Sequence, residues 1–203
     1  MSDIELLAVH GLAVKKAGSP AAVAEILGAG EAEVQQALDA ATADGRVVGA
    51  KGMLMITPAG RTWLDERYPE MYASLRADPV AEEAYQRFER INRRLLALMT
   101  DWQMMPAGSE RVPNDHSNAD YDHDIIDKLG ALHERAHRPL EQFAALQPRL
   151  ARYLERLESA YDKVLAGDHD WVSGARIDSY HTVWFELHED LLRMLGRERE
   201  EQP

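Results

Sequence analysis

The chain has 203 residues, of which 45% are hydrophobic, and this is enough to build two modest domains with buried cores. Its 23 Lys and Arg face 35 Asp and Glu, and the resulting net charge of −12 argues against broad, non-specific binding to nucleic acid. The absence of cysteine excludes disulfides, thiol chemistry and cysteine-ligated zinc, so His, Asp and Glu are the strong metal ligands that remain.

Apolar runs are short throughout the chain. None approaches the roughly 18 to 20 residues that a membrane-spanning helix needs. The N-terminus places acidic residues before its first apolar ones, which is the reverse of a secretory signal. We therefore expect a cytoplasmic protein with no membrane partner.

The first third of the chain predicts three short helices in succession. Ser19 is a suitable cap for the second helix, Pro20 suits its first position, and Gly28 suits its end. The expected helices cover residues 4–17, 20–27 and 31–44. Three short helices in a row indicate a helix-turn-helix.

Two short strands are predicted next, at residues 46–49 and 53–56, joined by the turn Ala50-Lys51-Gly52. Thr57 and Pro58 then cap and begin another helix. Three helices, a hairpin and a helix opening with "TPAGR" resemble the winged helix-turn-helix of MarR-like and PadR-like regulators over about residues 3–75. The resemblance implies that the third helix enters the major groove of double-stranded DNA and that Lys51, at the wing tip, touches the backbone or minor groove.

The third helix departs from that family pattern, because its exposed positions are acidic or neutral and include no basic residue. Its candidate base contacts are Gln35, Gln36 and Thr42. The candidate phosphate contacts are Lys15, Lys16, Arg46, Lys51 and Arg61. Residues 1–75 hold six basic and ten acidic residues, so a module for protein interaction or dimerisation is the alternative.

Residues 78–200 predict an antiparallel bundle of four amphipathic helices, and the fold class expected for the whole chain is therefore mainly α. The helices are expected at about 79–104, 120–146, 148–166 and 180–195. Pro139 is expected to kink the second of them. The segment 105–118, rich in Pro, Gly, Ser and Asn, is expected to be a lid or a disordered loop.

The second bundle helix contains His-Glu-x-x-His at His133 to His137, the pattern of helical zinc peptidases, and Glu158 lies where some such enzymes place a third ligand. A metal-dependent hydrolase is therefore one alternative. Against it, Glu134 is expected to point away from the core, and Pro139 would disturb the helix beside the site.

His181 and His188 are seven residues apart on the last helix and are expected on its apolar face, where imidazoles need a hydrogen-bond partner or a metal. They are either core histidines with polar partners or members of a divalent-metal site with His133 and His137, completed by Asp120, His123 or Asp124. A pocket for a small-molecule effector, walled by Tyr180, Trp184 and Phe185, is the third possibility.

The segments "NDHSNADYD", "LHERAH" and "DSYHTVWFELHEDLLRMLGRERE" resemble a helical domain of actinobacterial winged-helix proteins, which is also appended to phosphoenolpyruvate-utilising, dikinase-like enzymes. The sequence therefore predicts a dimeric winged-helix transcriptional regulator whose bundle senses a ligand or metal. The alternative that this resemblance implies is a non-DNA-binding accessory subunit of such a phosphotransfer enzyme.

Overall fold

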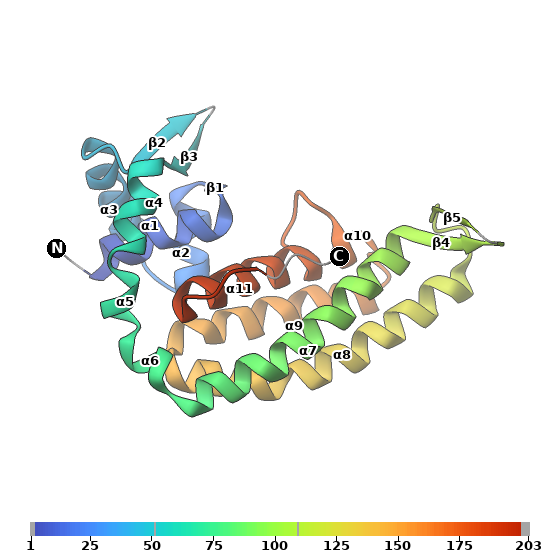
Figure 1. The fold of residues 1–203 in the computed structure, drawn as a ribbon. Helices are drawn as coiled ribbons and strands as arrows, with labels where there is room; N and C mark the ends of the chain where they lie inside the picture. Colours follow the sequence, from blue (N-terminus) through green and yellow to red (C-terminus); the bar gives the residue numbers. More distant parts are fainter. Residues whose placement is uncertain (1–2, 51, 109, 200–203) are drawn as a thin grey trace. The chain divides into compact units, whose positions relative to one another are not determined.

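A computed structural model describes residues 3–50, 52–108 and 110–199 (Figure 1). The chain divides into two compact units. Unit 1 comprises residues 1–78, 147–153 and 185–203, and unit 2 comprises residues 79–146 and 154–184. Unit 1 therefore contains residues 185–195 of the last helix, although the sequence analysis assigned that whole helix to the bundle.

Unit 1 begins with three helices: the second begins and ends at the caps expected from the sequence, whereas the first ends at Lys15, before the expected residue 17. The Ser19 hydroxyl accepts a hydrogen bond from the Ala22 amide at 3.2 Å, and Gly28 ends its helix at φ 64°. The helices are α1 (Asp3–Lys15), α2 (Pro20–Leu27) and α3 (Glu31–Ala43). Their buried faces, which include Leu12, Ile26 and Leu38, form the core of the unit.

A three-stranded antiparallel sheet accompanies these helices, in the order β1-β3-β2. The strands are β1 (Ala17–Gly18), β2 (Val47–Ala50) and β3 (Met53–Ile56). The hairpin pairs Val47 with Ile56, as expected, whereas the pairing of Ala17 with Met55 adds an edge strand that the sequence analysis missed. A two-residue strand leaves no alternating pattern to detect, which explains the omission.

Three further helices complete the N-terminal part of unit 1. Thr57 caps the first of them by accepting a hydrogen bond from the Gly60 amide at 3.1 Å. They are α4 (Pro58–Asp65), α5 (Tyr68–Met71) and α6 (Ala73–Ala77).

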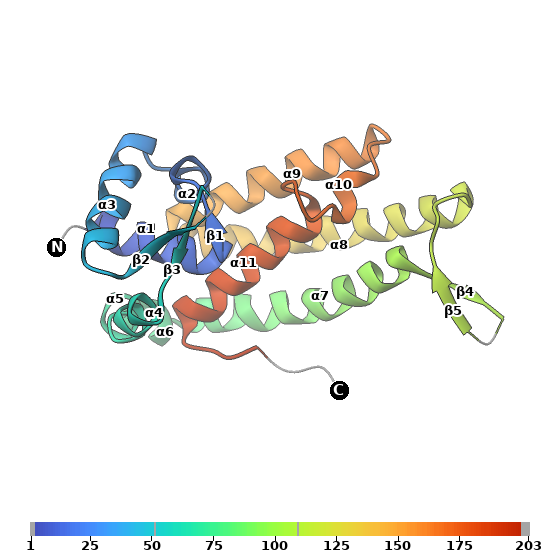
Figure 2. The ribbon, with the colours of Figure 1, turned by 90° about the horizontal axis from the view of Figure 1, so that it is seen from above.

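Unit 2 is built mainly from two long helices that lie side by side in both ribbon views (Figures 1 and 2). They are α7 (Pro79–Gln103) and α8 (Ala119–Leu146), and α8 continues through Pro139. Shorter elements follow along the chain: η1 (Pro148–Leu150), which belongs to unit 1, and then α9 (Ala151–Leu165), α10 (Asp170–Ser173) and α11 (Tyr180–Leu195). Helices α9 and α11 each contribute residues to both units.

The described residues of the connection between α7 and α8 include two paired strands, whereas its composition predicted a lid or a disordered loop. The connection forms an antiparallel hairpin of β4 (Met104–Ala107) and β5 (Glu110–Pro113). After the hairpin, the amide of Asn114 donates to the Asp122 carboxylate at 2.8 Å, and His116 lies 2.9 Å from the same carboxylate. Asp122 is buried, so these polar contacts fix the segment to the start of α8.

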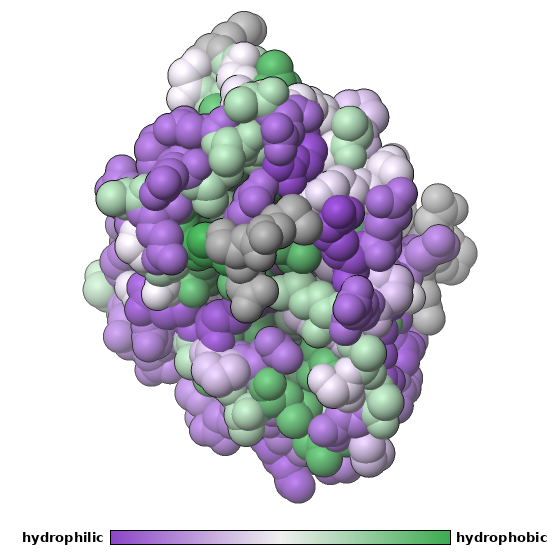
Figure 3. All heavy atoms as spheres, turned by 90° about the vertical axis from the view of Figure 1, so that its left-hand side faces the viewer, coloured by the Kyte–Doolittle hydropathy of each residue, from purple (hydrophilic) through white to green (hydrophobic). Residues whose placement is uncertain are grey.

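The surface seen from the left-hand side of Figure 1 is covered mainly by hydrophilic residues (Figure 3). Within the described residues, no helix combines the length and the apolar character that crossing a membrane requires.

Candidate metal centre

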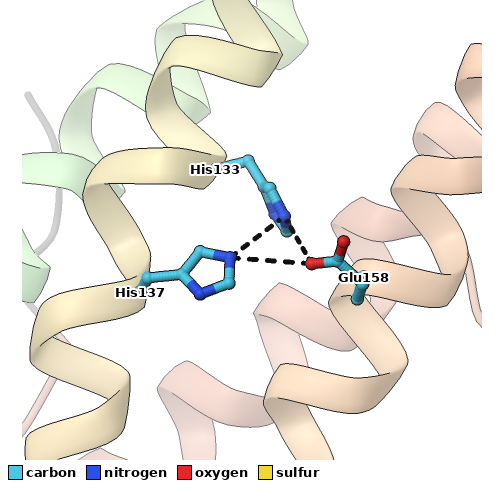
Figure 4. Close-up of side chains that lie close together, drawn as sticks. All are labelled: His133, His137 and Glu158. Carbon is cyan, nitrogen blue, oxygen red and sulfur yellow. Dashed lines mark hydrogen bonds and ion pairs between the residues drawn. The ribbon is translucent and has the colours of Figure 1, made fainter.

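His133, His137 and Glu158 converge in unit 2 from two helices (Figure 4). The four-residue spacing of the histidines places both imidazoles on one face of α8, and Glu158 extends toward them from α9. His133 Nε2 lies 3.3 Å from His137 Nε2 and 3.0 Å from Glu158 Oε2, and His137 Nε2 lies 3.6 Å from the same oxygen.

These three separations match one face of a tetrahedral metal site. Nitrogen and oxygen ligands about 2.0–2.1 Å from zinc lie about 3.3–3.4 Å apart at tetrahedral angles. The observed sides of 3.0, 3.3 and 3.6 Å average to that spacing, so an ion fits with small side-chain adjustments. Two imidazoles and one carboxylate also form a ligand set that suits zinc.

Two tyrosines hold the imidazole of His133 in this orientation. The Tyr180 hydroxyl lies 3.3 Å from His133 Nδ1, which leaves Nε2 to face Glu158. Burial raises the pKa of Tyr180, so its hydroxyl stays a neutral hydrogen-bonding group. The Tyr161 ring stacks on the imidazole with its centroid at 4.8 Å. A hydrogen bond to the second ring nitrogen is a usual means by which proteins fix the orientation of a metal-binding histidine.

Exposure differs among the three ligands. The His133 side chain is 8% exposed, whereas those of His137 and Glu158 are 44% and 51% exposed. One side of the cluster is therefore anchored in the protein and the other faces solvent. A three-ligand site of this kind leaves a fourth position for water or an exogenous ligand, unlike a closed structural site with four protein ligands.

Without a metal, the same groups form a hydrogen-bonded trio. The contact between the two Nε2 atoms needs one imidazole to donate and the other to accept, while Glu158 accepts from a protonated nitrogen. A divalent cation would replace the protons that these hydrogen bonds share, and it would bind both Nε2 atoms and the Glu158 oxygen at once.

His181 and His188, expected beside this cluster, are not members of it. His181 belongs to unit 2 and is partly buried, which lowers its pKa. His188 is buried in unit 1. Periodicity placed both residues on one helical arc, but it could not show that the compact units divide between Trp184 and Phe185.

The aromatic residues expected as pocket walls have other neighbours. Trp184 is buried, stacks on Phe88 at 4.8 Å and donates its indole N–H to the Asn92 amide oxygen at 3.0 Å. Phe185 belongs to unit 1, where the ammonium group of Lys16 lies 4.5 Å from its ring centroid. The remaining expected ligands Asp120, His123 and Asp124 are exposed and lie outside the cluster.

The candidate DNA contacts of unit 1 separate into three groups. The exposed residues are Gln35, Gln36, Thr42, Lys16 and Arg61. Lys51 lies outside the described residues. Lys15 instead pairs with Glu186 at 2.7 Å. Arg46 is buried, pairs with Glu5 and Asp44, and lies over the Trp63 ring. A phosphate contact needs an exposed guanidinium group, so Arg46 does not fit the role expected for it.

Sequence reasoning missed two residues that shape the cluster, Tyr161 and Gly130. Tyr161 is three residues after Glu158 and Gly130 is three residues before His133, so helical spacing places each on the same face as a ligand. A Cβ on Gly130 would lie 2.2 Å from the Tyr161 hydroxyl, so the glycine makes room for the tyrosine.

Neither a model of a known protein family, nor a curated protein, nor a solved structure matches the chain.

Proposed function

We propose that the protein binds a divalent transition-metal ion, with zinc as the first candidate, through His133, His137 and Glu158. The observation that carries the proposal is the triangle of donor atoms with sides of 3.0 to 3.6 Å, supported by Tyr180 and open to solvent on one side. Because the ligands come from α8 and α9, the ion would tie these two helices together. Ion binding would therefore favour one arrangement of the helical unit over others.

The role that we propose for this ion is regulation of a winged-helix transcription factor that acts as a dimer on double-stranded DNA. Three helices, a hairpin and a capped helix at Pro58 are the elements on which the MarR-like and PadR-like resemblance rests, and the β1 strand completes a small sheet beside them. Gln35, Gln36 and Thr42 are exposed on α3 and remain the proposed base contacts.

One observation favours a different role for unit 1. The exposed side of α3 also carries Glu31, Glu33 and Asp39, which would repel phosphates, and Gln35 donates to Asp39 at 2.8 Å. An acidic helix of this kind suits a basic protein surface. Accordingly, an accessory subunit of a phosphotransfer enzyme, with the same metal site, is the second candidate.

Metal-assisted hydrolysis is the third candidate, and the position of Glu158 favours it. The two histidines of the His-Glu-x-x-His pattern lie in one cluster with a glutamate 21 residues beyond His137, and this cluster has an open fourth position. Glu134 is exposed and would serve as the general base.

Calorimetric titration of the chelator-treated protein with zinc chloride tests metal binding directly. We expect one ion per chain, with affinity lowered about 100-fold or more in His133→Ala, His137→Ala and Glu158→Gln. His123→Ala, which removes an exposed histidine from the same helix, should bind zinc normally. Equal affinity in the wild type and in His133→Ala would overturn the proposal.

Two further measurements separate the three roles. A gel shift against the DNA upstream of the protein's own gene, at about 50 and 200 mM salt with and without zinc, should show salt-sensitive, metal-dependent binding for a regulator. A hydrolase should cleave peptides in a chelator-sensitive reaction that Glu134→Gln abolishes while zinc binding persists. An accessory subunit should do neither.

A further inference from the structure

A second site in unit 2 is a basic cavity between α7 and α8. It has a volume of about 230 Å³, and every charged residue of its lining is an arginine. The five are Arg87, Arg90, Arg94, Arg135 and Arg138. Ile91 and Pro139 supply the apolar part of the lining. This local excess of positive charge is opposite in sign to the net charge of −12 of the whole chain.

Helical spacing brings the five guanidinium groups together. Arg87, Arg90 and Arg94 follow one another at intervals of three and four residues on α7, and Arg135 and Arg138 are three apart on α8. Like charges at these intervals repel one another on a helix surface. The cluster therefore lowers the stability of unit 2 unless an anion neutralises it.

Carboxylates of the protein neutralise only part of this charge. Arg87 pairs with Glu83 at 2.5 Å. Among the described residues, the other four arginines form no ion pair or hydrogen bond, and no Asp or Glu lines the cavity. These four residues are exposed.

We propose that this cavity binds the diphosphate or triphosphate group of a small molecule. Arginine presents a planar fork of N–H donors that matches pairs of phosphate oxygens, and the lining contains no lysine. Glu83 neutralises Arg87, and the other four cations still exceed the charge of a single phosphate group and suit two or three linked phosphates. The volume is below the roughly 300 Å³ at which pockets for whole drug-sized ligands begin, so it fits the phosphate chain better than an entire nucleotide.

The shape of the site favours a small ligand over the backbone of a nucleic acid. Double-stranded DNA presents phosphates along an extended surface, and a backbone-binding site would need basic residues spread over a comparable length. Here the arginines surround one cavity. The net charge of −12 also opposes binding of a long polyanion.

Calorimetric titration with sodium pyrophosphate, tripolyphosphate, ADP and AMP tests the proposal. EDTA is kept in the buffer so that zinc binding at His133 plays no part. A negative result with pyrophosphate would then overturn the phosphate site and leave the zinc proposal untouched. Pyrophosphate, tripolyphosphate and ADP should bind at about 50 mM NaCl and more weakly at about 200 mM NaCl, whereas AMP should bind at least about tenfold more weakly than ADP. If ADP binds more tightly than pyrophosphate, the ligand is a nucleotide; if it binds equally or less tightly, the ligand is an inorganic polyphosphate.

Arg94→Gln and Arg138→Gln, one from each helix, should each lower the pyrophosphate affinity by about tenfold. Arg93→Gln is the matched control, because Arg93 is exposed on α7 beside Arg94 and does not line the cavity. It should change the affinity less than about twofold. The absence of pyrophosphate binding at low salt, an equal loss in Arg93→Gln, or tighter binding of a DNA duplex than of tripolyphosphate would each overturn the proposal.

Discussion

His10 Nε2 lies 2.9 Å from Asp190 Oδ1, a contact that joins α1 to α11 across 180 residues of sequence in the core of unit 1. Both side chains are completely buried. The carboxylate also accepts two hydrogen bonds from Arg149, at 2.5 and 2.7 Å, and one from the Tyr153 hydroxyl at 3.0 Å. Although burial alone would raise the pKa of Asp190, Arg149 and His10 hold it well below its usual range.

Asp190→Asn should destabilise unit 1 strongly. The substitution keeps the size of the side chain but leaves the Arg149 guanidinium without its counter-ion, and breaking one half of a buried ion pair costs about 3–5 kcal/mol. Chemical denaturation followed by circular dichroism measures the loss. Glu70→Gln, an exposed change in the same unit, should stay within about 0.5 kcal/mol of the wild type. A similar small loss in Asp190→Asn would mean that the carboxylate contributes little to folding.

The local features of unit 1 were predictable, but this cluster was not. Ser19 and Thr57 act as the helix caps that their positions in the sequence indicated, because capping depends on residues three apart. His10 and Asp190 lie on separate helices at opposite ends of the chain. No periodic pattern pairs residues at that separation, so the contact becomes visible only once the fold is known.

The stability of unit 1 should fall as the pH decreases below about 6.5, the ordinary pKa of histidine. Burial lowers the pKa of His10, so the folded state holds this imidazole neutral while the unfolded state takes up a proton. The His10 contribution is therefore present above the unfolded pKa and is lost as the pH falls through the folded pKa. Denaturation curves at intervals between about pH 5 and pH 8 measure the slope.

His10→Gln keeps a polar side chain but removes the titration. Its stability should be lower at neutral pH, yet should vary less than the wild type between about pH 5 and pH 7. His123→Ala, which removes an exposed histidine from unit 2, provides the comparison. An unaltered slope in His10→Gln would show that another group causes the pH dependence of unit 1.

The candidate metal centre was only partly predictable. The His-Glu-x-x-His spacing and the distance to Glu158 indicated the three ligands, because a helix places residues four apart on one face. The expected participation of His181 and His188 followed from the same periodicity, which carries no information about neighbouring helices. Polar composition likewise suggested a loop at 105–118, whereas pairing across the β4–β5 hairpin depends on contacts between its strands.

Gly130→Ala should destabilise unit 2 even though alanine favours helices. The intrinsic helical gain is about 1 kcal/mol, whereas overpacking costs about 1–3 kcal/mol, and here the new Cβ would lie 2.2 Å from the Tyr161 hydroxyl. We expect a net loss of stability and weaker zinc binding, because Tyr161 stacks on His133. Thermal denaturation and zinc titration test the two effects.

The double variant Gly130→Ala with Tyr161→Phe separates the clash from other causes. Removing the hydroxyl eliminates the closest contact and leaves the ring carbon at 3.2 Å, which a small shift can relieve. Stability and zinc affinity should therefore recover most of the way to wild type. A double variant as unstable as Gly130→Ala alone would show that the tyrosine hydroxyl is not the obstacle.

Tyr180→Phe should weaken zinc binding while leaving the fold of unit 2 intact. The hydroxyl lies 3.3 Å from His133 Nδ1, and its loss frees the imidazole to rotate and to exchange tautomers. Loss of such a supporting hydrogen bond typically lowers metal affinity about 10- to 100-fold. Competition with a chromophoric zinc chelator measures the change. Tyr161→Phe keeps the stacked ring and should bind zinc normally; if Tyr180→Phe also does, the Tyr180 hydroxyl has no part in orienting His133.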